Sequence, residues 1–198
     1  LALTIENNPD LMAGTRIYKK ENKVRSIQYT FYDEDGVKFT NVTSVLSGDN
    51  KGNEGKNPAG NLFDEVHDNN DREQYDNLKS AQVVQAEPFN IITTTAGKKP
   101  NSLGAQIYAY AKEAMLNDDD DSWFVMIYEP NKGYDWEDPE VWKMVNPNYP
   151  DVVTMDFLEA RYREAKKNSF NKAEFLSKHL NVFVNYAETY FELEQIER

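Results

Sequence analysis

Residues 58–68 read Pro58-Ala59-Gly60-Asn61-Leu62-Phe63-Asp64-Glu65-Val66-His67-Asp68. In this stretch a short apolar run, Leu62 and Phe63, ends in two adjacent carboxylates, Asp64 and Glu65. This pattern is typical of a buried strand that delivers an acidic pair to the edge of a parallel sheet. By itself the pair also fits a short strand that ends in a solvated turn, because Asp-Glu dipeptides are common and short motifs give false matches.

A second stretch further along the chain reads Pro88-Phe89-Asn90-Ile91-Ile92-Thr93-Thr94-Thr95-Ala96-Gly97. Phe89–Ile92 resembles another short buried strand, and it ends in three threonines. The polar segment Asp71–Ala86 carries apolar residues near helical spacing, so strand, helix and strand form a βαβ unit of ordinary length. We therefore predict that the two strands are parallel neighbours, with Asp64 and Thr93 at the same carboxyl edge of the sheet.

Four segments follow one another along the chain at Asp64–His67, Ile91–Gly97, Tyr134–Asn148 and Phe175–Asn181. In this order and spacing they resemble the large terminase subunit of tailed bacteriophages, the motor that pumps DNA into the capsid. The first resembles that family's Walker B motif with its catalytic glutamate, and the second its coupling motif. The third is similar to its Trp-Asp…Trp…Asn-Pro segment, and the fourth resembles a late family segment. The whole similarity runs from about Asn57 to Asn181.

The resemblance implies roles for the residues at the two strand ends. Asp64 would hold the Mg²⁺ that accompanies ATP, and Glu65 would activate the attacking water. Thr93, Thr94 and Thr95 would contact the nucleotide and transmit its hydrolysis to movement. ATP and Mg²⁺ would be the cofactors of the intact protein. His67 follows the carboxylate pair and is therefore a candidate hydrogen-bonding neighbour of this site. A zinc site is not predicted, because the two histidines of the chain have no further histidine or cysteine as a partner.

A phosphate-binding Gly-x-x-x-x-Gly-Lys-Ser/Thr loop does not occur in the 198 residues. The glycine-rich segment Gly48–Gly60 includes Gly55-Lys56, but Asn57 follows where serine or threonine is required, so we interpret it as a solvated loop. In the resembled family this loop precedes Walker B by a long interval, so we expect it before Leu1. The family's two-metal nuclease domain is also expected outside, since Glu188–Glu197 resembles a charged helix face. Residues 1–198 alone should therefore be inactive.

The composition limits the class of protein. The net charge is −12, from 34 acidic and 22 basic residues, which argues against this piece holding DNA by itself. The absence of cysteine excludes a disulfide framework and a thiolate metal site. No apolar run approaches the roughly 18 residues of a membrane helix. The resemblance implies double-stranded DNA, the small terminase subunit and the capsid portal as partners, a homo-oligomeric ring, no membrane, and the host cytoplasm as location.

The predicted fold is α/β: a partial P-loop NTPase-like, mostly parallel sheet with flanking helices, followed by a helical C-terminal segment. Before it, residues 26–32 and 37–42 should form a hairpin around an acidic turn. Trp123–Tyr128 is strongly apolar and is predicted to add a buried strand. Helices are predicted from Asp138-Pro139, from Thr154, and from a capping box at Asn171–Glu174. We place a partial, P-loop NTPase-like ATPase domain at 1–148 and, at 149–198, a helical segment that leads towards the nuclease domain expected outside these residues.

Two alternatives remain open from the sequence. An acidic, aromatic-rich α+β binding module without catalysis would also accommodate the 12 tyrosines and the early strands, with Asp64-Glu65 as a surface turn. Another P-loop motor, such as a DExH-type helicase, is suggested by Asp64–His67. The intact gene separates these hypotheses, because a terminase has a phosphate-binding loop upstream and an acidic nuclease domain downstream.

Overall fold

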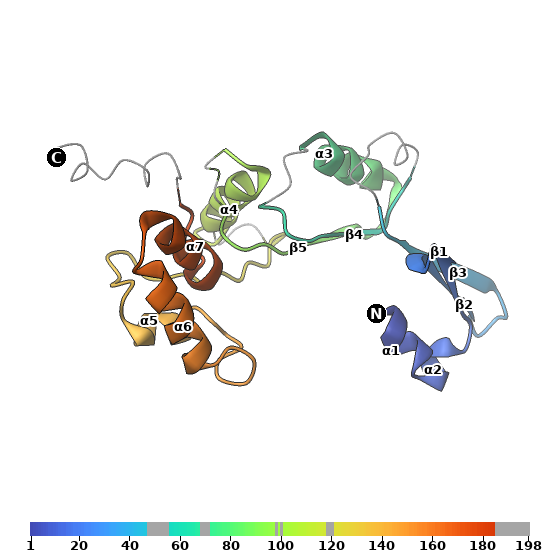
Figure 1. Ribbon diagram of the computed structural model, residues 1–198. Helices are drawn as coiled ribbons and strands as arrows, with labels where there is room; N and C mark the ends of the chain where they lie inside the picture. Colours follow the sequence, from blue (N-terminus) through green and yellow to red (C-terminus); the bar gives the residue numbers. More distant parts are fainter. Residues whose placement is uncertain (47–55, 68–71, 98, 100, 118–120, 185–198) are drawn as a thin grey trace, which may run out of the picture. The chain divides into compact units, whose positions relative to one another are not determined.

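The structure is a computed structural model that describes residues 1–46, 56–67, 72–97, 99, 101–117 and 121–184 (Figure 1). Two compact units, Leu1–Gly55 and Lys56–Arg198, make up the chain. Most of the glycine-rich segment, including its Gly55, and the whole acidic segment at 188–197 lie outside the described residues.

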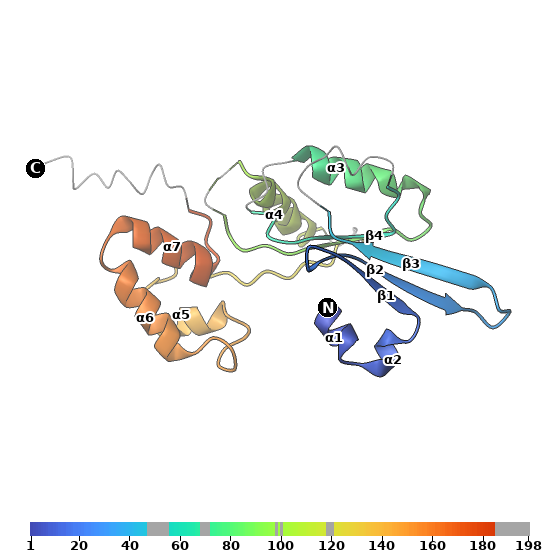
Figure 2. The ribbon, with the colours of Figure 1, turned by 45° about the vertical axis from the view of Figure 1, so that its right-hand side comes forward.

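The first unit contains a three-stranded antiparallel sheet (Figure 2). Its middle strand pairs on both sides, and the register places Phe31 opposite Phe39. The acidic turn between the last two strands is closed by Asp33, whose Oδ1 accepts hydrogen bonds from the backbone N–H groups of Asp35 and Val37. The predicted hairpin is therefore confirmed. The elements are α1 Ala2–Glu6, α2 Pro9–Met12, β1 Thr15–Lys20, β2 Lys23–Tyr32 and β3 Lys38–Ser44.

The second unit begins with the predicted βαβ arrangement. Strands β4 (Gly60–Phe63) and β5 (Phe89–Ile92) pair in parallel, with Leu62 opposite Ile91. The crossover between them holds α3 (Arg72–Ser80) and a short 3₁₀ helix, η2 (Ala81–Val84). The prediction of parallel neighbouring strands is confirmed.

Helices cover one face of the β4–β5 pair. Helices α3 and α4 (Leu103–Ala114) lie on the same side of the strands in Figures 1 and 2. Val66, Tyr75 and Leu103 form a buried cluster there, with Phe63, Ile92 and Ile107 packed against it. The helical cover explains why Asn61, Phe63 and Ile92, which point to this side, are withdrawn from solvent.

The opposite face of β4–β5 is bare in the described part of the chain. Leu62, Phe89 and Ile91 share that face, because they occupy alternate positions in register, and all three are exposed, Leu62 to 69%. The outer edge of β5 is open as well. The N–H groups of Phe89 and Thr93 donate to β4 and its flank, so the backbone groups of Asn90 and Ile92 point away from β4.

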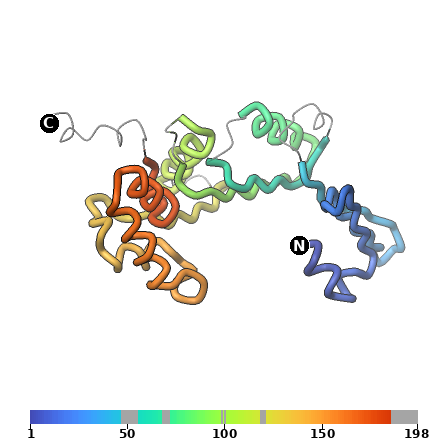
Figure 3. The backbone as a smooth tube through the Cα atoms, viewed as in Figure 1, coloured from blue at the N-terminus to red at the C-terminus, as the bar shows by residue number. Residues whose placement is uncertain are grey.

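The predicted strand at Trp123–Tyr128 is wrong. These residues have no secondary structure, and Figure 3 traces them between α4 and the following helix. They alternate between half-buried and exposed side chains, with Phe124 exposed to 89%. The alternation suits a strand, but a ladder also needs a neighbouring strand, and no described strand pairs with these residues.

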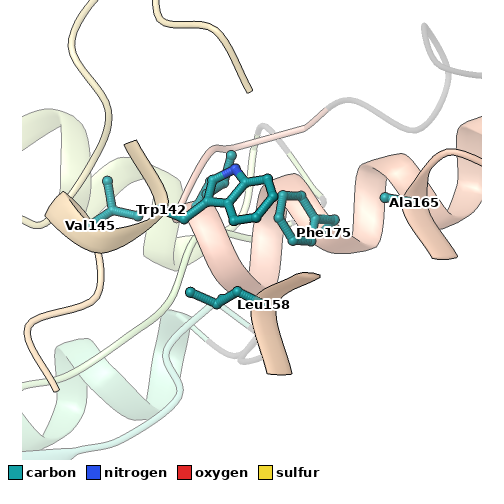
Figure 4. Packing of buried hydrophobic residues seen from close by; sticks show 6 residues of the cluster. Trp142, Val145, Leu158, Ala165 and Phe175 are labelled. Carbon is teal, nitrogen blue, oxygen red and sulfur yellow. The ribbon is translucent and has the colours of Figure 1, made fainter. Parts of the chain in front are cut away.

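Three helices form the last described part: α5 (Pro139–Met144), α6 (Met155–Ala165) and α7 (Ser169–Leu180). We call them the helical bundle. Its core contains Trp142, Val145, Leu158, Ala165, Phe175 and Leu180, and Figure 4 shows five of these side chains labelled. The Trp142 and Phe175 rings meet edge to face, with centroids 5.6 Å apart.

Polar caps set the starts of these helices. Asp138 and Thr154 cap α5 and α6 as predicted. The predicted capping box at Asn171–Glu174 is wrong, because α7 begins earlier and its cap is Asn168, whose Oδ1 accepts the N–H of Asn171 at 2.8 Å. An asparagine with extended backbone geometry serves as well as serine or threonine at this position.

The domain boundary placed at 148/149 stays a prediction. Helix α5 precedes it, whereas α6 and α7 follow it and pack with α5 in one core. Among the described helices, none combines the length and apolar character that a bilayer crossing requires.

Candidate active site

Asp64 and Thr93 meet at the carboxyl ends of the two parallel strands. The Thr93 Oγ1 donates to Asp64 Oδ1 at 2.6 Å, and the Thr93 N–H donates to the Phe63 carbonyl at 2.9 Å. The same Asp64 oxygen accepts the backbone N–H of Glu65 at 3.0 Å. Two donors thus fix one oxygen of the Asp64 carboxylate and leave the other without a recorded bond to the described residues.

Glu65 lies in the tight turn that follows β4. Its φ of 52° is in the left-handed region. This conformation is unfavourable for a residue that has a Cβ, so other contacts must offset its cost in free energy. The side chain is 61% exposed, and its Oε2 is 3.1 Å from His67 Nδ1. The carboxylate therefore faces solvent beside Asp64 instead of joining the core.

His67 connects the acidic turn to the threonines. Its backbone N–H donates to Thr94 Oγ1 at 2.9 Å, and its Nδ1 lies 3.3 Å from Thr94 Oγ1 and 3.4 Å from Thr95 Oγ1. All five residues predicted for the site are thus brought together. His67, expected only as a neighbour, contacts three of them.

Two glycines allow this close packing. A Cβ on Gly104 would stand 2.8 Å from His67 Cα, and one on Gly97 would stand 3.1 Å from His67 Cβ. The first turn of α4 therefore packs directly against the backbone at His67. The packing role of these two glycines has no local sequence signature, because it depends on contacts between distant segments.

A polar cluster near the site was also missed. Tyr108 and Lys112 on α4 both donate to the Glu129 carboxylate. Burial raises the pKa of Tyr108 to about 12, together with the hydrogen bond that Tyr108 makes to Glu129 and the negative charge of Glu129. Burial raises the pKa of Glu129, but hydrogen bonds from Lys112 and Tyr108 and the charge of Lys112 outweigh it, so that the pKa is lowered overall. Glu129 is therefore an ionised anchor that holds residues near 129 to α4.

A groove of about 800 Å³ runs beside the site. Its lining includes residues 88–96, with the three threonines, and residues 122–129, together with parts of α3, α4 and the segment after α7.

The donor set at Asp64 fits a magnesium ion that a nucleotide brings. Within the described ranges, no three His, Cys, Asp or Glu side chains gather as a ready metal cage. Mg²⁺ at nucleotide sites usually takes one or two protein carboxylates, while water and phosphate oxygens supply the remaining ligands. One oriented carboxylate beside a hydroxyl matches that requirement.

The chain is similar to a protein family, to a protein of Escherichia coli and to a solved structure. The family model for the terminase large subunit, ATPase domain, matches residues 12–113. Protein YmfN of Escherichia coli (strain K12) is 30% identical over 144 residues, which is 71% of this chain and 31% of that protein. The large terminase of HK97 bacteriophage has the same fold, with a TM-score of 0.71 and 18% identity over 92% of this chain and 36% of that one. This chain thus spans about a third of each relative's length.

The family match covers both strand ends of the site and both predicted motifs there. It favours the terminase over a DExH-type helicase and over a non-catalytic module. The chain therefore belongs to the family of the terminase large subunit, ATPase domain.

Proposed function

We propose that this protein, in its intact form, is the ATP-hydrolysing large subunit of a phage terminase that packages double-stranded DNA. The observation that carries the proposal is the contact of Asp64 with Thr93 at the shared edge of β4 and β5, with Glu65 beside it. In open α/β sheets, ligands bind at this edge.

Asp64 and Glu65 divide the chemistry between them in this proposal. Asp64, oriented by Thr93 and by the Glu65 N–H, would hold the metal that accompanies the nucleotide. Bound Mg²⁺ would neutralise the negative charge of the phosphates during transfer. The Glu65 carboxylate accepts the proton of the attacking water, and the nearby His67 restrains its position.

Hydrogen bonds connect the three threonines at residues 93–95 to Asp64 and His67, so that a movement at the carboxylates changes the contacts of the threonines. Thr93 bonds Asp64, while Thr94 and Thr95 both contact His67. A shift of the Asp64 side chain would break or strengthen its contact with Thr93. The three threonines are therefore proposed to contact the nucleotide and to report its state to the chain that follows β5.

The proposed partners are double-stranded DNA, the small terminase subunit and the capsid portal, with subunits assembled as a homo-oligomeric ring in the host cytoplasm. The net charge of −12 supports the view that much of the DNA grip lies outside these residues. Binding of the ATP phosphates is likewise assigned to a loop outside these residues, because the Gly-x-x-x-x-Gly-Lys-Ser/Thr motif does not occur in them.

ATP turnover by the intact protein, with and without portal, tests the proposal. Glu65→Gln keeps the side chain's shape but removes the charged base, so turnover should fall by about 10²–10⁴-fold. Asp64→Asn weakens the metal shell, so raising the magnesium concentration should restore part of its activity but none of that lost in Glu65→Gln. Glu87→Gln, at an exposed carboxylate just before β5, is the matched control and should retain activity.

Turnover by Glu65→Gln within a few-fold of the parent would show that the catalytic assignment is wrong. Near-normal turnover by both Glu65→Gln and Asp64→Asn would favour the solvated-turn interpretation of the acidic pair.

A further inference from the structure

The loop after β5 is attached at its far end to the helical bundle. We call residues 93–97 the threonine loop. Ser177, on α7, is 2% exposed, and its Oγ donates to the Ala96 carbonyl at 2.6 Å. Ala96 itself is 5% exposed. This bond joins residues that are 81 positions apart in the chain and lies within the interior.

Further contacts reinforce the attachment. The Val184 N–H donates to the Gly97 carbonyl at 3.4 Å, and Phe183 lies 3.7 Å from the position that a Cβ on Gly97 would take. Asn181, which ends α7 in the left-handed conformation, donates its Nδ2 to the Tyr128 carbonyl at 3.0 Å. The end of α7 and residues 181–184 thus contact both the threonine loop and residues 122–129.

We propose that Ser177 is a positioning residue for the candidate active site: through the Ala96 carbonyl it fixes the threonine loop to the helical bundle, so that loop and bundle move together. The effect on turnover rests on the proposed ATPase function, whereas the effect on the loop does not. Because α7 is itself held by the bundle's buried core, the fixed end of the loop is as rigid as that core. Its other end is bonded to Asp64 and His67.

Removing the Ser177 hydroxyl leaves a buried carbonyl without its donor. Such a loss shifts a local opening equilibrium by about tenfold. Among the described residues, three backbone N–H groups donate to the loop from outside it, those of Val66, His67 and Val184. Their exchange with deuterium therefore reports on the loop directly, while the amide of Leu158, which donates to the Thr154 carbonyl in the first turn of α6, reports on local opening of α6.

The first experiment is residue-resolved hydrogen exchange by NMR on the 198-residue chain. In Ser177→Ala, the three reporting amides should exchange about tenfold faster than in the parent, with Leu158 unchanged. Ser169→Ala, at an exposed serine on the same helix, is the matched control and should change none of them. Ser177→Cys keeps a weak donor of similar size and should give an intermediate result, which also serves if Ser177→Ala does not fold.

The second experiment is steady-state ATP turnover by the intact protein. Ser177→Ala should lower kcat by about fivefold to tenfold while KM for ATP stays within twofold, since the loop is misplaced and the nucleotide grip lies elsewhere. Ser177→Cys should recover part of kcat.

The outcomes separate the two hypotheses. Unchanged exchange at the reporting amides, or equal acceleration at Leu158, would overturn the positioning role. Accelerated exchange with normal kcat would confine Ser177 to structure and overturn its link to the reaction. An intact parent protein without ATPase activity would refute the proposed function, and the exchange result would still decide whether Ser177 fixes the loop.

Discussion

Replacing Glu65 by glycine should leave the second unit more stable than replacing it by alanine, and either change removes the proposed base. Glu65 adopts φ 52°, a conformation that glycine takes without steric cost. The informative comparison is Glu65→Gly against Glu65→Ala. Both variants lose the 3.1 Å contact with His67 and the carboxylate, so those effects cancel and only the backbone differs.

The expected difference follows from two opposing terms. Alanine in the left-handed region costs about 1–2 kcal/mol from the contact of its Cβ with the following carbonyl. Glycine avoids this cost, but it loses about 0.5–1 kcal/mol more conformational entropy on folding. Glu65→Gly should therefore be more stable than Glu65→Ala by about 0.5–1 kcal/mol.

Urea unfolding followed by tryptophan fluorescence measures this difference in the right unit. The three tryptophans, Trp123, Trp136 and Trp142, all belong to the second unit. Glu21, at the β1–β2 turn, has the same φ of 52° and provides the control pair Glu21→Gly and Glu21→Ala, followed by circular dichroism of the first unit. The same ranking is expected there, without any effect on ATP turnover by the intact protein.

A Glu65→Ala variant that equals or exceeds Glu65→Gly in stability would refute the reasoning. If only the Glu21 pair follows the ranking, contacts specific to the acidic turn outweigh the backbone preference at Glu65.

Three further predictions follow from the described geometry. Leu158→Ala should lower the free energy of unfolding by about 2–5 kcal/mol because Leu158 is fully buried, whereas exposed Val152→Ala should change it by less than about 0.5 kcal/mol in the same urea titration. Burial, with the charges of Arg161 and Lys178, lowers the pKa of His179 below its usual 6.5, so that the unfolded chain takes up the proton at a higher pH than the folded chain and the free energy of unfolding should fall as the pH drops through about 6.5. His179→Gln should flatten this pH dependence, and a parent chain that is equally stable at pH 7.5 and 5.5 would contradict the prediction. The 198-residue chain should bind ATP weakly and not hydrolyse it, because backbone N–H groups and the lysine of a phosphate-binding loop supply most of the phosphate grip; micromolar affinity by calorimetry, or steady turnover, would refute this.

Local patterns predicted the elements that position the site. The two short strands, their parallel pairing and the contact of Asp64 with Thr93 follow from a βαβ unit and the rule that its strand ends share an edge. The Asp138 and Thr154 caps were equally local. Each of these predictions uses residues close in sequence or a general rule of topology.

Features that depend on distant partners were not predictable. Trp123–Tyr128 has the alternation of a strand, yet a strand is defined by its neighbour, and the described residues provide none. The Tyr108–Glu129 and Ser177–Ala96 bonds join separate segments whose side chains carry no local signature. The central place of His67 results from two glycines that let other segments approach it.

The open edge of β5 and the bare face beside it have a practical consequence for handling the protein. Parallel sheets are normally covered on both faces, and an unpaired apolar edge is a template for another extended chain. When residues 1–198 are produced alone, Asn90 and Ile92 offer backbone groups for a new ladder, next to the exposed Leu62, Phe89 and Ile91. Association at high concentration should therefore begin at this edge, and a lysine in place of Ile91 should keep the chain soluble.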